Sequence, residues 1–502
     1  MSKPNLGKGI SRTALIGIVV VVVVVIAIGA YFAYVSLHKP PTKPQVLVVY
    51  GPWGVNTPEG QAFLSIVSSF EKEYHVKVEY VGTTDYTTEA QEIESGSPPF
   101  DVVINAEVSL LRQLAAGGYL VDLTPYLERS GVLSQLIPYY VNYLNVSGAV
   151  YGVPVDAWTK PGIYVWVPTF ERYNIPLPQS ISTRWSWTQF MNYASDLKSH
   201  GVIPLGSGAA DEWPLVIVYE PIVYSIGGKD LYYAIMCHKI SYTSPIVEQT
   251  FEFYLALIAK GYFGTPAFAA SQHFTGVYPL MENGTVAMYF MGDWTPFFLH
   301  NYTAAQPIMA PYINPTLANQ YFIVSSGDWA VVPKDAPHNK TLAIEFALWL
   351  ASKEFQEKVL EIGWRAISPN RAAMEAAVSG QITVPPASKV VEEWVLQFSN
   401  NLLPDIADNM PSQFEHDVFW PTLAKMISNP SGWLNDLAYM EQEANLIYNQ
   451  TNWDNTYYLC QNVTYTGPSV YTGPMYGVPQ SLQSSGIPLP SWQTSQSSQG
   501  LR

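Results

Sequence analysis

The fold of this chain is decided by the stretch 45–80, which opens with QVLVVYGPWG at residues 45–54. Its first six residues form a short, mostly apolar run, which is typical of a strand buried on both faces of a parallel sheet. Thr57 can then cap a helix, because apolar residues between 63 and 70 recur at helical spacing. Residues 76–80 alternate apolar and charged side chains, as a strand does. The stretch therefore predicts a strand–helix–strand unit.

Strands and helices continue to alternate through the body of the chain, so the predicted fold class is α/β. We expect strands at 101–104 and 152–155 and a helix at 108–118. Further helices are expected at 187–199, 245–260, 341–349, 352–362 and 431–448. The body spans about 420 residues, from 45 to 465, and exceeds the size at which one hydrophobic core keeps growing, so we expect two lobes. The absence of a repeat of about 20–50 residues argues against solenoids and propellers.

The amino-terminal end predicts a membrane anchor. Residues 13–37 are uncharged and rich in Val, Ile and Ala, and about 20 apolar residues suffice to cross a bilayer as a helix. Three cations precede this run in the basic leader 1–12 and should hold that end in the cytoplasm. A Pro-rich and Lys-rich linker follows at 38–44. The sequence thus predicts a single-pass membrane protein with an extracellular body.

The anchor can be retained or removed. The run is longer than the apolar part of a typical signal peptide, about 7–15 residues, which favours retention, although residues 27–30 offer a loose cleavage site. Cys237 and Cys460 are the only cysteines, so a lipid cannot be attached by a thioether near the amino terminus. The leader KGISR at 8–12 resembles the class III, pilin-like signals of archaeal surface proteins, which are clipped ahead of the apolar segment.

Composition limits the partners of the body. Charged residues make up 13% of the chain and the net charge is −15, which argues against nucleic acid, because its binding needs clustered Lys and Arg. A surface with few ionisable groups resists acid unfolding, so acidic surroundings fit. The tail 466–502 is rich in Pro, Ser, Gly and Gln, and predicts a disordered extension.

Two kinds of covalent modification are predicted for an exported body. Cys237 and Cys460 can form one disulfide, although the sequence does not give their separation in space. Asn-x-Ser/Thr acceptors for glycans occur at Asn145, Asn283, Asn301, Asn339, Asn449 and Asn462.

Four phrases, taken in order, resemble the extracellular sugar-binding proteins of ABC importers. They are GSPPFDVV at 96–103, LAAGGYLVDLT at 114–124, GAVYGVP at 148–154 and LMENGTVAM at 280–288, the last closing on MGDW at 291–294. FMGDW at 290–294 and MPSQF at 410–414 resemble the glucose-binding branch of thermophiles and archaea. One departure is YVWVP at 164–168, where family members usually place an Asn-Lys pair.

The resemblance implies a two-lobed, type II periplasmic-binding-protein-like fold with a ligand in the cleft between the lobes. We expect the amino-terminal lobe at 45–156 and 301–330, and the carboxyl-terminal lobe at 157–300 and 331–465. The implied function is a membrane-tethered, monomeric, non-enzymatic receptor that captures a glucose-like monosaccharide and delivers it to an ABC permease. No cofactor is implied.

Candidate site residues follow the ends of expected strands, where ligands bind in open α/β sheets. Sugars need aromatic plates for the ring and carboxylates or amides for the hydroxyls, because an unpaired buried polar group costs about 1–3 kcal/mol. The candidates are Trp53, Asn105, Glu107, Asp156, Trp158, Glu212, Trp213, Asp293, Trp294, Trp364 and Arg365. Each has a structural alternative: most tryptophans pack in cores, a carboxylate can cap a helix, and Arg365 can lie over an aromatic face.

Other functions remain open at this point. An exported glycoside hydrolase would need two carboxylates about 5–9.5 Å apart around the scissile bond. An oligosaccharide-binding protein would use the same fold, and a pilin-like structural subunit is suggested by the amino-terminal helix alone. No metal site is expected, because His273 and His416 lack partners at metal-ligand spacing.

Overall fold

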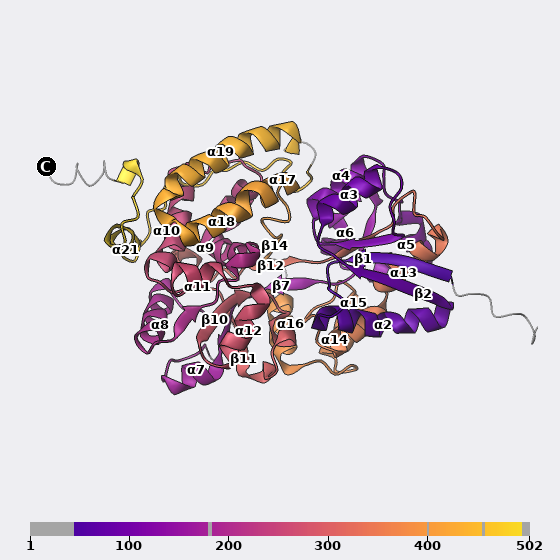
Figure 1. The fold of residues 1–502 in the computed structure, drawn as a ribbon, viewed down its shortest axis with the longest axis horizontal. Coiled ribbons are helices and arrows are strands. Elements are labelled where there is room, and N and C mark those ends of the chain that lie inside the picture. Colours follow the sequence, from indigo (N-terminus) through magenta and orange to yellow (C-terminus); the bar gives the residue numbers. More distant parts are fainter. Residues whose placement is uncertain (1–44, 179–182, 399–400, 454–456, 494–502) are drawn as a thin grey trace, which may run out of the picture.

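A computed structural model describes residues 45–178, 183–398, 401–453 and 457–493. These residues form two α/β lobes that lie side by side and are joined by a narrow waist of strands (Figure 1). The predicted α/β class and the two-lobed arrangement are both confirmed.

The first lobe contains a five-stranded sheet in the order β2-β1-β3-β13-β6. Its strands are β1 (Gln45–Gly51), β2 (Val76–Gly82), β3 (Val102–Asn105), β6 (Gly152–Pro154) and β13 (Trp329–Val331). β1 pairs in parallel with β2 and β3, whereas β13 runs antiparallel to β3 and β6. Just before β6 in the chain, β4 (Asn145–Val146) and β5 (Ala149–Val150) pair with each other in a separate small hairpin.

Helices cover both faces of this sheet, which explains why β1 is a continuous apolar run. Leu47 and Val49 enter one core cluster with α2, while Val48 and Tyr50 pack on a second cluster with α3 and α4. α2 begins as predicted, since the Thr57 side chain accepts a hydrogen bond from the Gly60 N–H at 3.1 Å. The first-lobe helices are α2 (Pro58–Tyr74), α3 (Tyr86–Glu94), α4 (Val108–Ala116), α5 (Thr124–Ser130), α6 (Pro138–Tyr143), α13 (Lys340–Leu350), α14 (Lys353–Glu361) and α15 (Arg371–Val378).

The second lobe is built around a four-stranded sheet in the order β11-β8-β10-β9. Its strands are β8 (Gly162–Trp166), β9 (Ile203–Leu205), β10 (Val286–Met291) and β11 (Ala305–Met309). Its helices are α7 (Val167–Arg172), α8 (Trp187–Ser199), α9 (Pro214–Met236), α10 (Pro245–Ala259), α11 (Pro266–Ala270), α12 (Phe274–Glu282), α16 (Pro386–Phe398), α17 (Ser412–Phe414), α18 (Trp420–Ser428), α19 (Trp433–Gln450) and α21 (Val478–Ser484). The largest core cluster of the molecule fills this lobe.

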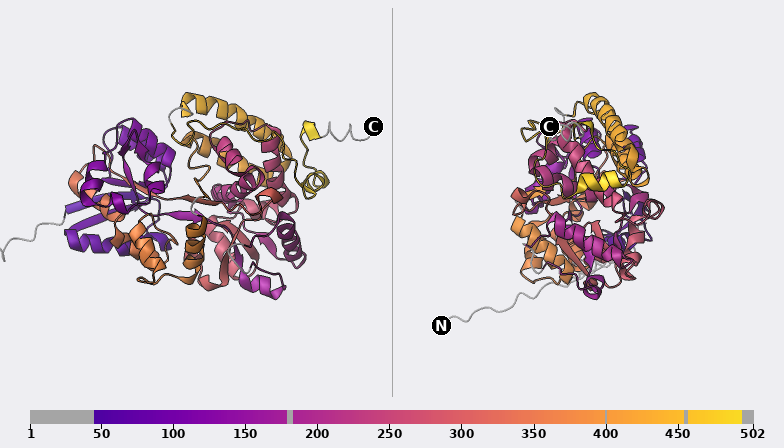
Figure 2. Two further views of the ribbon diagram at one scale, coloured as in Figure 1. Left: turned by 180° about the vertical axis from the view of Figure 1, so that it is seen from behind. Right: turned by 90° about the vertical axis from the view of Figure 1, so that its left-hand side faces the viewer.

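The waist is a three-stranded sheet in the order β14-β12-β7. Its strands are β7 (Trp158–Lys160), β12 (Ile323–Ser326) and β14 (Leu402–Leu403). The chain passes between lobes from β6 to β7, from β12 to β13, and again between α15 and α16. Figure 2 shows the same waist from behind.

The lobe boundaries differ from those expected. β11, at Ala305–Met309, pairs with β8 of the second lobe, although 301–330 was assigned to the first. Residues 342–364 of α13, α14 and the following turn join the core of the first lobe, although 331–465 was assigned to the second. The reason is that both segments bury apolar faces against the sheet that the chain has just left.

Residues 466–493 of the carboxyl-terminal tail depart from the prediction of disorder, and residues 494–502 lie outside the described part of the chain. Tyr471 is 6% exposed and Leu482 is fully buried against the second lobe. The Tyr471 N–H donates to the side-chain oxygen of Gln249 at 2.7 Å, and α21 packs on α10. The tail is therefore ordered from 466 to 493. Single aromatic and apolar residues anchor it to the second lobe, although its sequence has no regular apolar period.

The predicted disulfide between Cys237 and Cys460 is present, with Cα atoms 5.3 Å apart. It ties the end of α9 to the segment after α19. Among the predicted glycan acceptors, Asn283, Asn301, Asn449 and Asn462 are exposed, while Asn145 and Asn339 are half-buried. Glycosylation remains a prediction.

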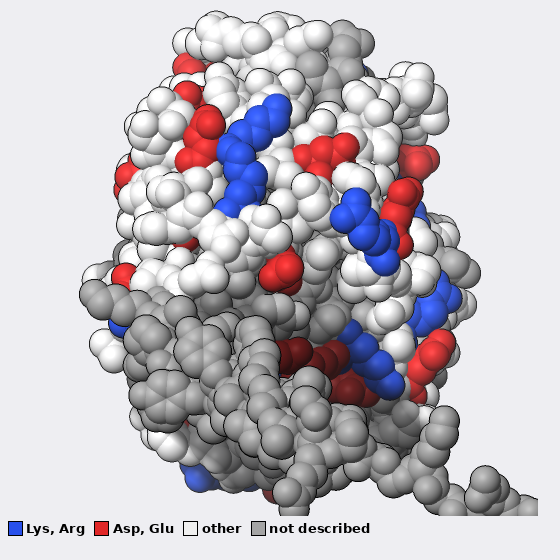
Figure 3. Space-filling view, turned by 90° about the vertical axis from the view of Figure 1, so that its right-hand side faces the viewer, with Lys and Arg blue, Asp and Glu red and all other residues white. Residues whose placement is uncertain are grey.

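Figure 3 shows a face on which charged side chains are scattered among uncharged ones, as the low charged fraction predicts. Within the described residues, no helix combines the length and the apolar character needed to cross a membrane. The leader 1–12, the anchor 13–37 and the linker 38–44 lie outside those residues and remain predictions.

Candidate ligand-binding cleft

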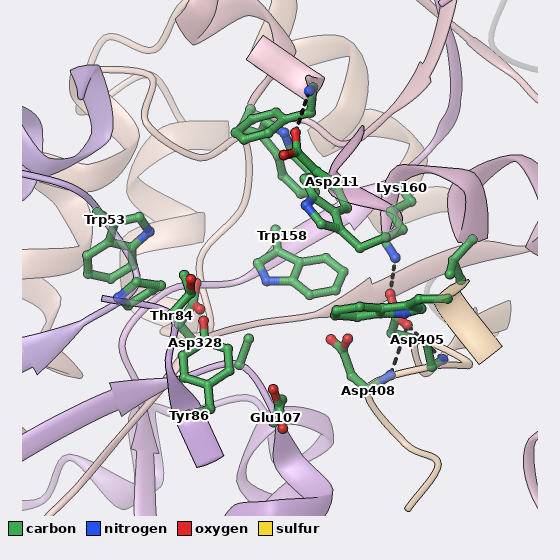
Figure 4. Close-up of a pocket in the computed structure, with 18 of the residues that line it drawn as sticks. Trp53, Thr84, Tyr86, Glu107, Trp158, Lys160, Asp211, Asp328, Asp405 and Asp408 are labelled. Atoms are coloured by element: carbon green, nitrogen blue, oxygen red, sulfur yellow. Dashed lines mark hydrogen bonds and ion pairs between the residues drawn. The ribbon is translucent and has the colours of Figure 1, made fainter. Parts of the chain in front are cut away.

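A cavity of about 530 Å³ lies between the two lobes at the waist (Figure 4). The first lobe contributes Pro52, Trp53, Glu59, Thr84, Tyr86 and Glu107. The second lobe and the waist contribute Trp158, Lys160, Asp211, Trp213, Trp294 and Trp420. Since ligands bind beyond the carboxyl ends of strands, this is the position that the α/β topology favours.

Indole rings dominate the second-lobe side. Trp158 follows the crossing from β6 and packs edge-on against Trp294, with ring centroids 5.8 Å apart and an interplanar angle of 90°. Trp213, at the start of α9, lies 6.2 Å from Trp294 between centroids. Trp158 and Trp294 are 6% and 8% exposed, so only a small part of each indole reaches the cavity. Such faces suit the apolar patch of a sugar ring.

Arg365, which follows α14, is the centre of one group of charges. Its Nε donates to Asp156 Oδ2 at 2.7 Å and its Nη1 donates to Glu59 Oε1 at 2.8 Å. Its Nη2 lies 3.7 Å from Asp328 Oδ2. Arg365 and Asp156 are 3% and 0% exposed. We call Arg365 with Asp156, Glu59 and Asp328 the Arg365 centre; one cation there balances three carboxylates in part.

Burial and the excess of carboxylates around Arg365 raise the pKa values of two aspartates. Burial and the charge of Asp156 raise the pKa of Asp328 well above its usual range. Burial also raises the pKa of Asp293 to about 7, although the charge of Arg365 opposes the shift. Asp293 accepts a hydrogen bond from the Ala366 N–H at 3.2 Å and thereby joins the second lobe to the chain after Arg365. Neutral carboxyls can donate to sugar hydroxyls as well as accept from them.

Lys160, at the end of β7, is held by two buried acids of the second lobe. Its ammonium pairs with Asp405 and lies 3.6 Å from Glu220 Oε2. Glu220 also accepts from the Tyr232 hydroxyl at 2.7 Å. Neither Lys160 nor Arg365 is therefore unpaired, and the described lining offers no other Lys or Arg to an anionic ligand. The cleft favours uncharged ligands with many hydroxyls.

Glu107 crosses the cleft from the first lobe. It follows β3 as the residue before α4, and its N–H donates to the side-chain oxygen of Asn105 at 2.6 Å, which fixes the turn. Its carboxylate accepts from Ser412 Oγ at 2.8 Å and lies 3.0 Å from His416 Nε2, both in the second lobe. The role of helix capping, considered from sequence, is not seen, since the side chain makes no capping hydrogen bond.

The predicted site residues divide into three groups. Those in the cavity lining are Trp53, Glu107, Trp158, Trp213, Trp294 and Arg365. Asn105 and Asp156 lie outside the lining and accept hydrogen bonds from the lining residues Glu107 and Arg365, and Asp293 accepts from the Ala366 N–H next to Arg365. Trp364 and Glu212 do not line the cavity. Trp364 is fully buried, and its ring centroid lies 4.6 Å from that of Trp53. Glu212 follows a short 3₁₀ turn and has a φ of +61°. Whether any of these residues touches a ligand remains a prediction.

Several lining residues were absent from the sequence-based set, namely Lys160, Asp211, Asp328, Asp405, Asp408, His416 and Trp420. Asp405 and Asp408 follow the short strand β14, so the strand-end rule could have found them. His416 and Trp420 sit in and after a π-helical turn at Glu415–Phe419, which has no sequence signature.

The family model for the bacterial extracellular solute-binding proteins matches residues 54–357. The chain belongs to this family. An uncharacterized ABC transporter extracellular-binding protein of Pyrococcus horikoshii is 28% identical over 61% of this chain and 69% of that protein. The glucose-binding protein GlcS of Saccharolobus solfataricus is 26% identical over 45% of this chain and 38% of that protein.

Solved structures support the fold assignment. A chitin oligosaccharide binding protein superposes with a TM-score of 0.69 at 17% identity, covering 80% of this chain and 99% of that chain. The family match over residues 54–357 confirms the expected family, and the protein is an extracellular solute-binding receptor of an ABC transporter. This membership speaks against a pilin-like structural subunit.

Proposed function

We propose that this protein is a membrane-anchored receptor that captures a glucose-like monosaccharide in the cleft and delivers it to an ABC import permease. The observation that carries the proposal is the combination of indole faces with carboxylates and paired cations around one cavity. The similarity to a glucose-binding protein over 45% of the chain supports the monosaccharide.

Anchoring is supported by the apolar run at 13–37 and by the basic leader ahead of it. A tether keeps the receptor close to its permease, because it raises the effective concentration of the loaded protein at the membrane. The receptor makes and breaks no bond: the lobes close around the ligand and present one surface to the permease.

A second candidate ligand is an oligosaccharide. The cavity volume of about 530 Å³ lies inside the common range for small-molecule pockets, roughly 300–1,000 Å³, and leaves space beyond a single ring. The fold neighbour that binds chitin oligosaccharides points the same way.

The direct test is calorimetric titration of residues 45–502 with a panel of mono- and disaccharides, followed by chromatography of the incubated sugars. The proposal expects one saturable site, tightest for a hexose, and unchanged sugars after long incubation. Tighter binding of a di- or trisaccharide would favour the second candidate. Steady release of hydrolysis products would show an exported glycoside hydrolase instead.

A further inference from the structure

A cluster of metal-ligating side chains lies where the first lobe meets the second at the edge of the cleft. Glu107, at the start of α4, faces Glu415 and His416 of the π-helical turn. Each residue offers one ligand atom, and these atoms all lie within 4.8 Å of one another. Figure 4 shows Glu107 below Trp158, with Asp408 nearby on the second-lobe side. We call Glu107, Glu415 and His416 the interlobe triad.

The triad contains a buried carboxylate with no partner. Glu415 is 0% exposed, and neither of its oxygens accepts a hydrogen bond from the described residues. Glu107 is 2% exposed, so two carboxylates share a site with little water. An ionised carboxylate out of water costs several kcal/mol unless a cation or hydrogen bonds compensate it. The triad therefore calls for a positive charge.

No neighbouring side chain supplies enough of it. Lys160 is already paired with Asp405 and Glu220. Asp408 adds a third acidic group at this edge of the cavity. A protonated His416 could bring one positive charge at most, whereas a divalent ion would balance two carboxylates.

The orientation of His416 is the one that a metal ligand needs. Its Nδ1 lies 3.0 Å from the Ser412 carbonyl oxygen, which can only accept, so Nδ1 carries the hydrogen and donates. The lone pair of a neutral ring is then on Nε2, which faces Glu107 Oε1 at 3.0 Å. Metal-ligating histidines commonly donate their other N–H to a backbone carbonyl in this way.

The 3.0 Å separation is close to that of two ligand atoms that share an ion. Ligand atoms about 2.1 Å from a tetrahedral Zn²⁺ lie about 3.4 Å apart, so a side-chain shift of about 0.4 Å would bring both into its coordination sphere. His416 is 33% exposed in its side chain, which leaves an entry path from the cleft. Two carboxylates with one imidazole form a ligand set that suits Zn²⁺ and similar divalent transition metals.

We propose that Glu107, Glu415 and His416 form a divalent metal site, best suited to Zn²⁺, that links the two lobes. Because Glu107 belongs to the first lobe and the other ligands to the second, an ion held by all three favours the closed arrangement of the cleft. A metal would then add to ligand-driven closure, and it would protect the folded protein from heat, since it binds the native state only.

The test uses the full-length chain in detergent, stripped with a chelator and titrated with ZnCl₂ by calorimetry. One Zn²⁺ per chain is expected, together with a rise in unfolding temperature. Glu415→Gln and His416→Gln should each weaken Zn²⁺ binding by at least about 10-fold. Glu415 does not line the cavity, so sugar titration of Glu415→Gln without metal separates loss of the ion from loss of sugar contacts.

The matched control is His300→Gln, which removes an exposed histidine that also pairs with a glutamate, Glu282, at 2.9 Å. Its Zn²⁺ affinity should equal that of the wild type. Co²⁺ substitution gives a second readout, because visible absorption bands should appear in the wild type and be lost in Glu415→Gln. No Zn²⁺ uptake by the folded wild type, or equal uptake by both triad variants, would overturn the site. Glu415 would then be held neutral by a proton.

Discussion

Two acidic groups border the same cleft and are built in opposite ways. The Arg365 centre surrounds a buried guanidinium with carboxylates at 2.7 and 2.8 Å. The interlobe triad gathers two buried carboxylates around a half-buried imidazole and leaves Glu415 without a partner. The first arrangement supplies its own counter-charge and fixes the waist. The second lacks one and is therefore suited to take a cation from solution.

The largest effect should come from breaking the Arg365 centre. Arg365→Gln leaves Asp156, Glu59 and Asp328 close together and buried without a cation. Removing one partner of a buried ion pair costs about 3–5 kcal/mol, so the free energy of unfolding should fall by at least about 3 kcal/mol in chemical denaturation. The control Lys353→Gln breaks an exposed pair with Glu357 at 3.3 Å and should cost under about 1 kcal/mol. A loss for Arg365→Gln as small as that of the control would show that the centre is dispensable.

A second prediction concerns Glu89 on α3, which is 3% exposed. Burial, together with the charge of Glu107, raises the pKa of Glu89 from 4.5 to about 8. Between these values the unfolded chain ionises while the folded chain keeps its proton, so this group's contribution to stability is present below pH 4.5 and lost as the pH rises through 8. Glu89→Gln should therefore gain stability over the wild type at pH 9, on the order of 2 kcal/mol, but not at pH 4.

Thermal unfolding of the wild type and Glu89→Gln at pH 9 and pH 4 measures this difference in stability. Burial also raises the pKa values of Glu252 and Asp293 to about 7, which adds to the same trend and fits the acidic surroundings expected from composition. If Glu89→Gln gained no stability over the wild type at pH 9, Glu89 would be ionised in the folded protein without a penalty and its pKa would not be raised.

The third prediction concerns Trp294, which lies next to the Arg365 centre and lines the cavity. The Trp294 ring lies 5.8 Å from the Arg365 guanidinium and faces the cavity. Trp294→Ala should weaken sugar binding by at least about 1 kcal/mol, because an aromatic contact is lost. Calorimetry with the best sugar of the panel measures the change. Trp349→Phe is a matched control, since that tryptophan packs among Phe70 and Phe355 in the first lobe and should leave affinity unchanged. An unchanged affinity for Trp294→Ala would remove this ring from the site.

The smallest effect should come from the triad in the absence of metal. Glu107→Gln removes a buried carboxylate whose charge acts against Glu415 and keeps an oxygen that can accept from Ser412, so the free energy of unfolding should change by less than about 1 kcal/mol or rise. The same removal of one charge is thus costly at Arg365 and cheap at Glu107. A loss of about 3 kcal/mol or more for metal-free Glu107→Gln would contradict the comparison between the two groups.

Local patterns in the sequence predicted much of the first lobe. The apolar run of β1 and the Thr57 cap reflect contacts made within a few residues or by one sheet, so periodicity reveals them. The strand-end rule also placed Trp53, Glu107 and Trp158 at the cleft. The disulfide could be proposed because the chain has two cysteines.

Contacts between distant segments were beyond such patterns. Ser412 and Glu107 meet although they are 305 residues apart, and His416 joins them. The order of the tail depends on single residues, such as Tyr471, that fill gaps in the second lobe. The lobe boundaries depend on which sheet a returning segment packs against. The apolar residues of a helix such as α13 predict that it is buried, but they do not show which of the two sheets it covers.

We propose that the cleft holds an uncharged sugar between indole faces and acidic groups whose cations are already paired. Calorimetric titration of the full-length chain with the best neutral sugar and with its matching uronic acid tests this binding mode. We expect saturable binding of the neutral sugar and at least about 10-fold weaker binding of the uronate, because its carboxylate would meet unbalanced acids. Equal affinity for the two, or no heat with any sugar, would contradict it.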